Sequence, residues 1–190
     1  MMRLLVTLIA TMTLAADQQA RPQDQHADDP DYRRPAEAMP PFQLNYLAGT
    51  WTFEWDVPDS IFGTGGTITG TETVTCKADG KSCDSTVRGT LPEGSFSQLV
   101  TIAYDEDTRM MTRVERDSRG FVVRYVGQLS SDQGFHQIAF ASDPFRYQGR
   151  MLRLKSTASM TAPAAYRVRY QLSIDDGAFE NFGAPWWRKR

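Results

Sequence analysis

The feature that most constrains this chain is a two-residue alternation of apolar and polar side chains that recurs between residues 50 and 174. It is clearest at 67–76, where odd positions are threonine and even positions are Ile68, Gly70, Glu72, Val74 and Cys76. Successive side chains in a strand point to opposite faces, so the threonines predict a solvated face and the even residues an inner one. Glu72 then needs a partner or a function. The alternative is an exposed glutamate near an open end of the sheet.

The same period predicts several further strands. Four stretches are each expected to be a strand with one apolar face directed inward. The inner residues are Trp51, Phe53 and Trp55 in 50–57, and Phe96, Val100, Ile102 and Tyr104 in 96–104. They are Phe121, Val123, Tyr125 and Leu129 in 121–129, and Tyr166, Val168, Tyr170, Leu172 and Ile174 in 165–174. A stretch at 179–187 is expected to be the last strand, and Gly127 is expected to leave room for a bend or a ligand. Turn residues separate these runs, and residues 42–47 are long enough for one helical turn.

The fold class predicted from this pattern is all-β. About eight to ten sequential strands favour an up-and-down antiparallel barrel with a short N-terminal helical turn, because closure removes the two exposed sheet edges.

The first 41 residues differ in composition from the rest. A positive start, Met1 to Arg3, and an uncharged segment, Leu4 to Ala15, predict a signal peptide over 1–16, with an uncleaved anchor as the alternative. Residues 17–41 contain five prolines and few large apolar side chains, which predicts a disordered linker. The barrel domain is expected over 42–190. The protein is therefore predicted to be secreted or periplasmic, without a transmembrane segment after cleavage.

The charge of the chain argues against a nucleic-acid partner. Of 23 acidic residues six lie in 17–41, which leaves seventeen in 42–190, matched there by seventeen basic residues. A neutral domain lacks the basic excess that binds phosphate backbones.

Both cysteines lie in one predicted hairpin. If Asp79 and Gly80 form a two-residue turn, Cys76 and Cys83 lie directly opposite each other, at a Cα separation that suits a disulfide. Export would supply oxidising conditions. The alternative, a metal site, lacks further ligands nearby, and we predict no metal and no cofactor.

Three stretches carry a family resemblance: the opening LNYLAGTW, the central YDEDTRMMTRVERDSRG and the closing YRVRYQLSIDDGAFENF. The opening resembles the Gly-x-Trp of lipocalin-like (calycin) barrels, in which the tryptophan closes the barrel base. Together the three are similar to the bacterial domain of unknown function 1579. The cysteine hairpin and the turn at Ile174 to Gly177 depart from that pattern. The resemblance implies a fold and adds no catalytic residue.

Few residues carry an indication of chemistry. His136 shares a face with Ile138 and Phe140, so it could bind a ligand, coordinate haem as in the related nitrobindin-type barrels, act as a base, or simply be a core or solvent-facing residue. We find no nucleophile motif and assign no catalytic residue. The acidic clusters at 105–107 and 175–176 are typical of turns, with calcium as the alternative. The basic tail 185–190 suggests either a last strand with one tryptophan inside or a membrane-surface contact.

These observations lead to three functional hypotheses. The first is a non-enzymatic binding protein whose barrel encloses a small hydrophobic ligand, with contacts expected from Trp51, Glu72, Tyr104, Tyr125, His136 and Tyr170. The second is a cyclase or isomerase that uses Glu72 and His136 in the same lumen. The third is a filled barrel that serves a structural or interaction role at the cell envelope. The sequence does not indicate an oligomeric state.

Overall fold

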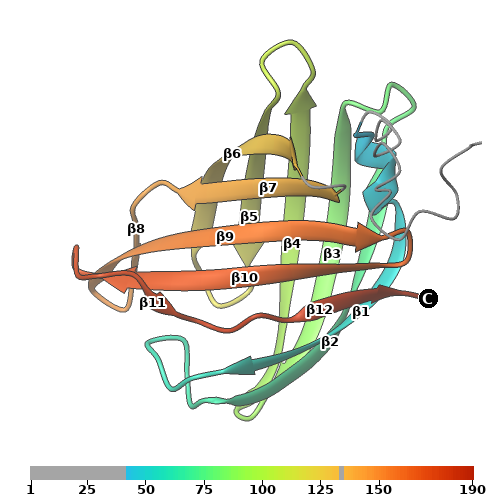
Figure 1. Cartoon of the computed structure of the whole chain (residues 1–190). Coiled ribbons are helices and arrows are strands. Elements are labelled where there is room, and N and C mark those ends of the chain that lie inside the picture. Colours follow the sequence, from blue (N-terminus) through green and yellow to red (C-terminus); the bar gives the residue numbers. More distant parts are fainter. Residues whose placement is uncertain (1–41, 133–134) are drawn as a thin grey trace, which may run out of the picture. The chain divides into compact units, whose positions relative to one another are not determined.

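The computed structural model describes residues 42–132 and 135–190, which form a closed all-β barrel (Figure 1). The signal peptide and linker predicted over 1–16 and 17–41 lie outside the described residues. In the described part of the chain, no helix is long and apolar enough to cross a membrane.

A short 3-10 turn, η1 (Leu44–Leu47), precedes the strands, as the sequence predicts. The strands are β1 (Gly49–Val57), β2 (Gly66–Cys76), β3 (Ser82–Leu91), β4 (Gly94–Asp105), β5 (Met110–Asp117), β6 (Val122–Asp132), β7 (Phe135–Ser142), β8 (Phe145–Tyr147), β9 (Arg150–Ala162), β10 (Ala165–Ile174), β11 (Glu180–Asn181) and β12 (Trp186–Lys189).

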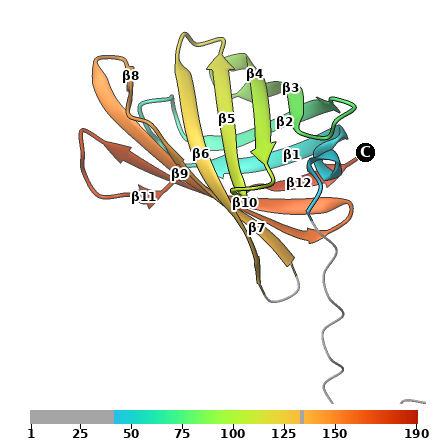
Figure 2. The same cartoon turned by 90° about the horizontal axis from the view of Figure 1, so that it is seen from above.

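Ten antiparallel strands form the ring of the barrel (Figures 1 and 2). From β1 to β7 each strand pairs with the next; β9 then pairs with β7 and β10, and β12 lies between β10 and β1. The short β8 and β11 pair with β9 and β10 outside this ring. The single last strand expected at 179–187 is instead two short strands. The chain between them keeps backbone hydrogen bonds to β10, from Phe182 N to Tyr170 O and from Tyr170 N to Gly183 O, but Gly183, with a φ of +101°, interrupts the regular strand.

The predicted inner faces are confirmed along the strands. Trp51, Phe53, Ile68, Val100 and Tyr166 are buried, whereas the threonines at 67, 69, 73 and 75 are exposed. One row across the wall has no side chain at its centre: Phe53 pairs with Gly70, Gly70 with Gly89, and Gly89 with Phe96. A Cβ on either glycine would collide with the neighbouring ring, so both rings lie flat against the wall. The ring of Phe140 likewise takes the room that Gly127 leaves.

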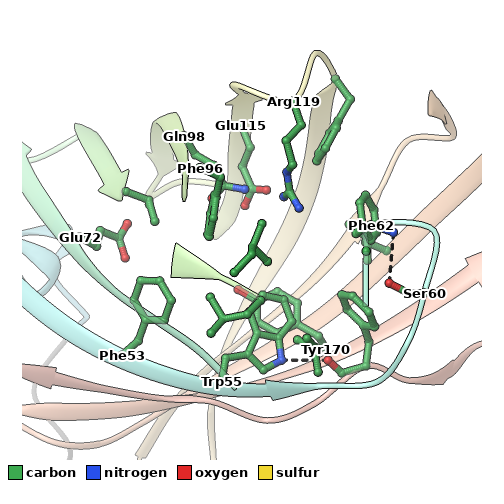
Figure 3. Close-up of a pocket in the computed structure, with 18 of the residues that line it drawn as sticks. Phe53, Trp55, Ser60, Phe62, Glu72, Phe96, Gln98, Glu115, Arg119 and Tyr170 are labelled. Carbon is green, nitrogen blue, oxygen red and sulfur yellow. Dashed lines mark hydrogen bonds between the residues drawn. The ribbon is translucent and has the colours of Figure 1, made fainter. Parts of the chain in front are cut away.

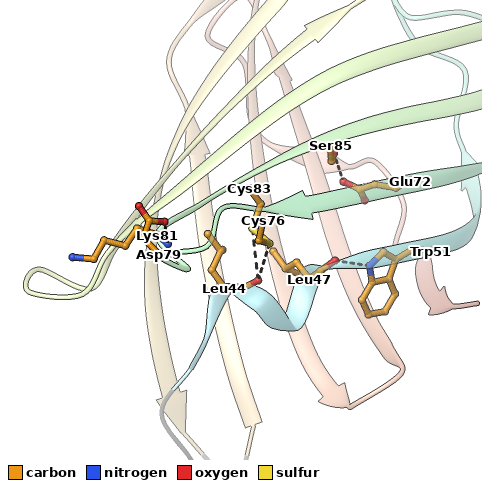
Figure 4. Close-up of a disulfide and its surroundings, with 9 residues drawn as sticks. All are labelled: Leu44, Leu47, Trp51, Glu72, Cys76, Asp79, Lys81, Cys83 and Ser85. Carbon is orange, nitrogen blue, oxygen red and sulfur yellow. Dashed lines mark hydrogen bonds between the residues drawn. A yellow bond between two sulfur atoms is a disulfide. The ribbon is translucent and has the colours of Figure 1, made fainter.

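One end of the barrel, which we call the η1 end, is sealed by η1 and the cysteine hairpin (Figure 4). Cys76 and Cys83 form the predicted disulfide from directly paired positions. The turn beyond them centres on Ala78 and Asp79 rather than on Asp79 and Gly80, because Gly80 N donates to Lys77 O. Both sulfur atoms contact Leu44 O of η1, at 3.8 and 3.9 Å. The disulfide thus holds η1 as well as the hairpin.

Candidate functional site

Two neighbouring cavities lie inside the part of the barrel that the structure describes. The outer cavity faces the loop end, where the β1–β2 loop (residues 58–65) lies, and the inner cavity faces the η1 end. The centre of a water molecule can occupy about 80 Å³ of the outer cavity. The whole empty space of this cavity, including its open mouth, is about 860 Å³. The corresponding values for the inner one are about 40 and 500 Å³. Glu72, Arg113, Tyr170 and Trp187 line both cavities and so mark their boundary.

The outer cavity is lined mainly by aromatic and aliphatic side chains, with a few polar groups among them, including Glu72, Gln98, Glu115 and Arg119 (Figure 3). Phe53, Trp55 and Phe96 form part of its wall, and Figure 3 shows Glu72 and Arg119 on opposite sides of it. Mostly apolar linings with a few placed polar groups are typical of small-molecule sites.

A central polar cluster, consisting of Glu72, Ser85, Arg113, Glu115, Tyr125, Tyr166 and Tyr170, lies at the boundary between the cavities. Arg113 and Glu115 project from alternate positions of β5 and form an ion pair with 2.6 Å between Nη2 and Oε1. Tyr125 donates a hydrogen bond of 3.3 Å to Glu115. Burial raises the pKa of Glu115, although Arg113 opposes this shift. For Arg113, burial disfavours the charge, but the attraction of Glu115 outweighs it and raises the pKa.

Glu72 is buried, and the structure supplies the partners that its position requires. Its Oε1 accepts a hydrogen bond of 2.7 Å from Ser85, and its Oε2 accepts one of 3.4 Å from Tyr166. Burial, together with the nearby Glu72 charge, raises the pKa of Tyr166 well above its usual value. Burial also raises the pKa of Tyr170, to about 12. The cluster therefore holds neutral phenols beside its carboxyl groups.

Two buried donors in this region lack acceptors. Neither Arg113 Nε nor Trp187 Nε1 has a hydrogen-bond partner among the residues that the structure describes. Trp187 is only 6% exposed, with its ring stacked between Tyr166 and Phe53 at centroid distances of 5.4 and 5.1 Å. A buried donor without an acceptor costs about 1–3 kcal/mol, so a molecule that supplied acceptors here would be stabilised.

At the mouth of the outer cavity, Arg119 forms a second ion pair. Its Nη2 lies 2.7 Å from Asp117 Oδ2 and its Nε donates to Oδ1 at 2.8 Å. Burial would raise the pKa of Asp117, but the bonds from Arg119 and Gln98 outweigh it and lower the pKa. The guanidinium also lies 4.9 to 5.6 Å from the ring centroids of Phe62, Phe96 and Phe121, within the range of cation–π attraction.

The β1–β2 loop covers part of this mouth. Its Phe62 ring stacks on Tyr147 and also contacts Phe121 and Phe182, with centroid distances of 5.4 to 5.8 Å. Side-chain carboxyls hold its backbone, since Gly65 N donates to Asp59 and Thr64 N donates to Glu93. Ring contacts and exposed hydrogen bonds are the kinds of interaction that local opening breaks most easily.

The structure brings together three of the six residues predicted for the site. Glu72, Tyr125 and Tyr170 line the outer cavity. Trp51, Tyr104 and His136 are not among the described residues that line either cavity. Trp51 packs beneath η1 and donates to Leu47 O at 2.7 Å, whereas Tyr104 and His136 both contact the ring of Phe42 edge-on. His136 and Glu72 therefore do not meet in one of these cavities.

The sequence reasoning missed Arg113, Glu115, Tyr166 and Trp187 as site residues. The pairing of β4 with β5 carries the signal for the first two: Ile102 pairs with Arg113 and Val100 with Glu115. Cross-strand partners share a face, so an inward Ile102 requires an inward Arg113. Val114, between them on the opposite face, is the apolar residue that faces out.

One comparison with a known structure agrees with the architecture. The structure is similar to the crystal structure of Rv2717c from M. tuberculosis, with a TM-score of 0.64 and 10% identity over 77% of this chain and 94% of that chain. A designed fluorescence-activating β-barrel matches with a TM-score of 0.39 and 17% identity over 77% of this chain and 96% of that chain. No family model and no curated protein matches the sequence. Fold and site together define a closed antiparallel β-barrel with a partly polar interior, and the first likeness supports the fold alone.

Proposed function

We propose that this protein binds one small, largely apolar molecule inside its barrel and is not an enzyme. The observation that carries the proposal is the outer cavity, whose aromatic wall ends at buried polar groups. Ligand sites combine a mainly apolar lining with a few oriented polar groups in this way. A barrel of this size has room for about one such molecule. The two cavities also weigh against a filled barrel that serves only as a structural element.

The remaining sequence predictions complete the proposal. We propose an exported protein, secreted or periplasmic, with a signal peptide at 1–16, a linker at 17–41 and a binding domain at 42–190. The Cys76–Cys83 disulfide suits an oxidising compartment. We also propose membership of the domain of unknown function 1579 family, on the three stretches described above.

Native mass spectrometry of the protein purified from its own source tests the proposal. We expect a complex heavier than the polypeptide, from which a small hydrophobic molecule is released on activation. The bare polypeptide mass alone, together with no binding of the apolar fluorescent probe N-phenyl-1-naphthylamine, would contradict it.

A matched pair of variants locates the site. Leu91 lines the outer cavity near its mouth, so Leu91→Trp is expected to weaken probe binding at least tenfold by occupying the space. Leu99 is 59% exposed on the outer face of neighbouring β4, so Leu99→Trp adds the same ring without entering the lumen. Equal effects of the two variants would place the probe outside the barrel.

A further inference from the structure

The charges inside the lumen are almost fully paired. Arg113 is neutralised by Glu115 and Arg119 by Asp117, at 2.6 and 2.7 Å. Glu72 adds a third carboxyl, with hydroxyl partners from Ser85 and Tyr166. A ligand carboxylate or phosphate entering the outer cavity would therefore find each described guanidinium already paired and a further carboxyl at the inner side. Like charges in a low-dielectric site repel strongly, so an anionic ligand is disfavoured.

Among the described residues, the two buried side-chain groups without a hydrogen-bond partner are both donors. Arg113 Nε and Trp187 Nε1 need an acceptor, and their side chains line both cavities at the same boundary. A protonated amine has no acceptor lone pair, so it cannot satisfy them, whereas a carbonyl oxygen has two. The two donors and the paired charges thus select against both anions and cations.

The outer cavity completes this description with an apolar chamber. Phe53, Trp55 and Phe96 line the path from the boundary to the mouth, where Phe62 and Arg119 lie. A molecule held at its acceptor by Arg113 and Trp187 would have its apolar part along these rings.

We propose that the ligand is a neutral apolar molecule that carries an uncharged acceptor, such as a ketone, aldehyde or ester, and that its carbonyl oxygen accepts hydrogen bonds from Arg113 Nε and Trp187 Nε1. This inference rests on the proposed function and assigns the chemical class of the ligand. Arg113 and Trp187 are its specificity-determining residues.

Competition against N-phenyl-1-naphthylamine tests the inference with three ligands of equal carbon number: decan-2-one, decanoate and decylamine at neutral pH. We expect decan-2-one to displace the probe at a concentration at least tenfold lower than either charged ligand. Stronger binding of decanoate or decylamine would overturn the assignment. If the probe itself fails to bind, the proposed function fails; if the probe binds but decan-2-one has no advantage, the inference alone fails.

Two variants then test the donors. Trp187→Phe removes Nε1 and keeps a ring against Tyr166 and Phe53, so affinity for decan-2-one is expected to fall about tenfold more than affinity for the probe, the worth of one hydrogen bond. Trp186→Phe is the matched control, since Trp186 is 36% exposed on the opposite face of β12, and neither affinity should change. A Trp187→Phe variant that binds both ligands as before would remove Trp187 from the site.

Arg113→Met is the second variant. It is combined with Glu115→Gln so that the carboxylate of residue 115 is not left buried and unpaired. Loss of the preference for decan-2-one over decanoate is expected. Retention of that preference in the folded double variant would contradict the assignment of Arg113.

Discussion

Two tryptophans of β1 reach opposite ends of the same barrel and meet different surroundings. Trp51 is fully buried at the η1 end and donates to Leu47 O at 2.7 Å. Trp55 is half-buried at the loop end and donates to Phe182 O at 2.9 Å, with its ring stacked on Tyr170. The acceptor lies four residues from Trp51 in the sequence, but 127 residues from Trp55.

The two ends also differ in what holds them together. The η1 end combines this local bond with contacts from distant strands, such as that of the Trp51 ring with Tyr166, and a disulfide contacts Leu44 O there. The loop end is assembled from rings of distant segments, including Phe62, Phe121, Tyr147 and Phe182. Local opening should therefore begin at the loop end. The outer cavity lies at this end, which opens more easily.

The largest expected effect comes from removing the sealed tryptophan. Trp51→Ala should lower the free energy of unfolding by about 3–5 kcal/mol, because it leaves a large cavity and removes a buried hydrogen bond. Trp55→Ala, at the partly solvated end, should cost about half as much. Urea unfolding followed by circular dichroism measures both. Equal losses of unfolding free energy would show that the side chains at the two ends are equally well packed.

The second-largest effect on stability is expected from the central polar cluster between the two ends, at alkaline pH. The pKa of Tyr170 is about 12 in the fold against 10.0 in the unfolded chain, so its contribution to stability is complete below pH 10 and is lost as the pH rises to about 12. Two pKa units correspond to about 2–3 kcal/mol, and Tyr125 and Tyr166 act in the same direction.

Urea midpoints measured between pH 9 and 12, with phenolate absorbance recorded in parallel, check this expectation. Tyr170→Phe should show a shallower fall than the natural chain. Ionisation of every tyrosine near pH 10 in an intact barrel would refute the buried cluster.

The disulfide should contribute less. Cys76 and Cys83 are seven residues apart, and closing so short a loop stabilises the fold by about 2 kcal/mol. Reduction should lower the urea midpoint by the corresponding amount and leave probe affinity unchanged, because the bond lies at the end away from the outer cavity. The Cys76→Ala, Cys83→Ala double variant should be insensitive to reductant. A large loss of probe binding on reduction would link the two ends.

The smallest change in stability, with the largest change in kinetics, is expected from Phe62→Ala. Loss of the half-buried ring should cost about 1 kcal/mol or less and raise the rate of probe association several-fold by uncovering the mouth. Stopped-flow fluorescence measures the rate, and Leu99→Ala on the outer face provides the comparison. An unchanged association rate would show that the loop does not limit entry.

Much of the fold follows from the sequence, and the reasons are local. The alternation in 67–76 and 121–129 determines which face is inside, and the cysteine spacing determines one hairpin register. The interior chemistry depends on longer-range facts. Arg113 and Glu115 face inward because β5 pairs with β4 in one register, after a turn that contains Arg109 at a φ of +56°. A shift by one residue would turn both outward.

The local sequence pattern also does not predict the split of residues 179–187 into β11 and β12. Gly183 approaches the Trp55 ring so closely that a side chain there would collide with it. This contact joins two parts of the chain that no local pattern connects. For the same reason Trp187 was not predicted as a site residue, since its neighbours Tyr166 and Phe53 lie in separate strands.

The position of β12 between β1 and β10 has a consequence for how the molecule is made. β12 closes the ring against a strand that was synthesised far earlier, with Arg188 O accepting a hydrogen bond from Thr52, 136 residues away. Until residues 186–189 emerge, β1 and β10 keep unpaired backbone edges that can join other chains. A growing or translocating polypeptide therefore remains vulnerable to aggregation until β12 arrives, and a nonsense mutation just before Trp186 would release a sheet with two open sides.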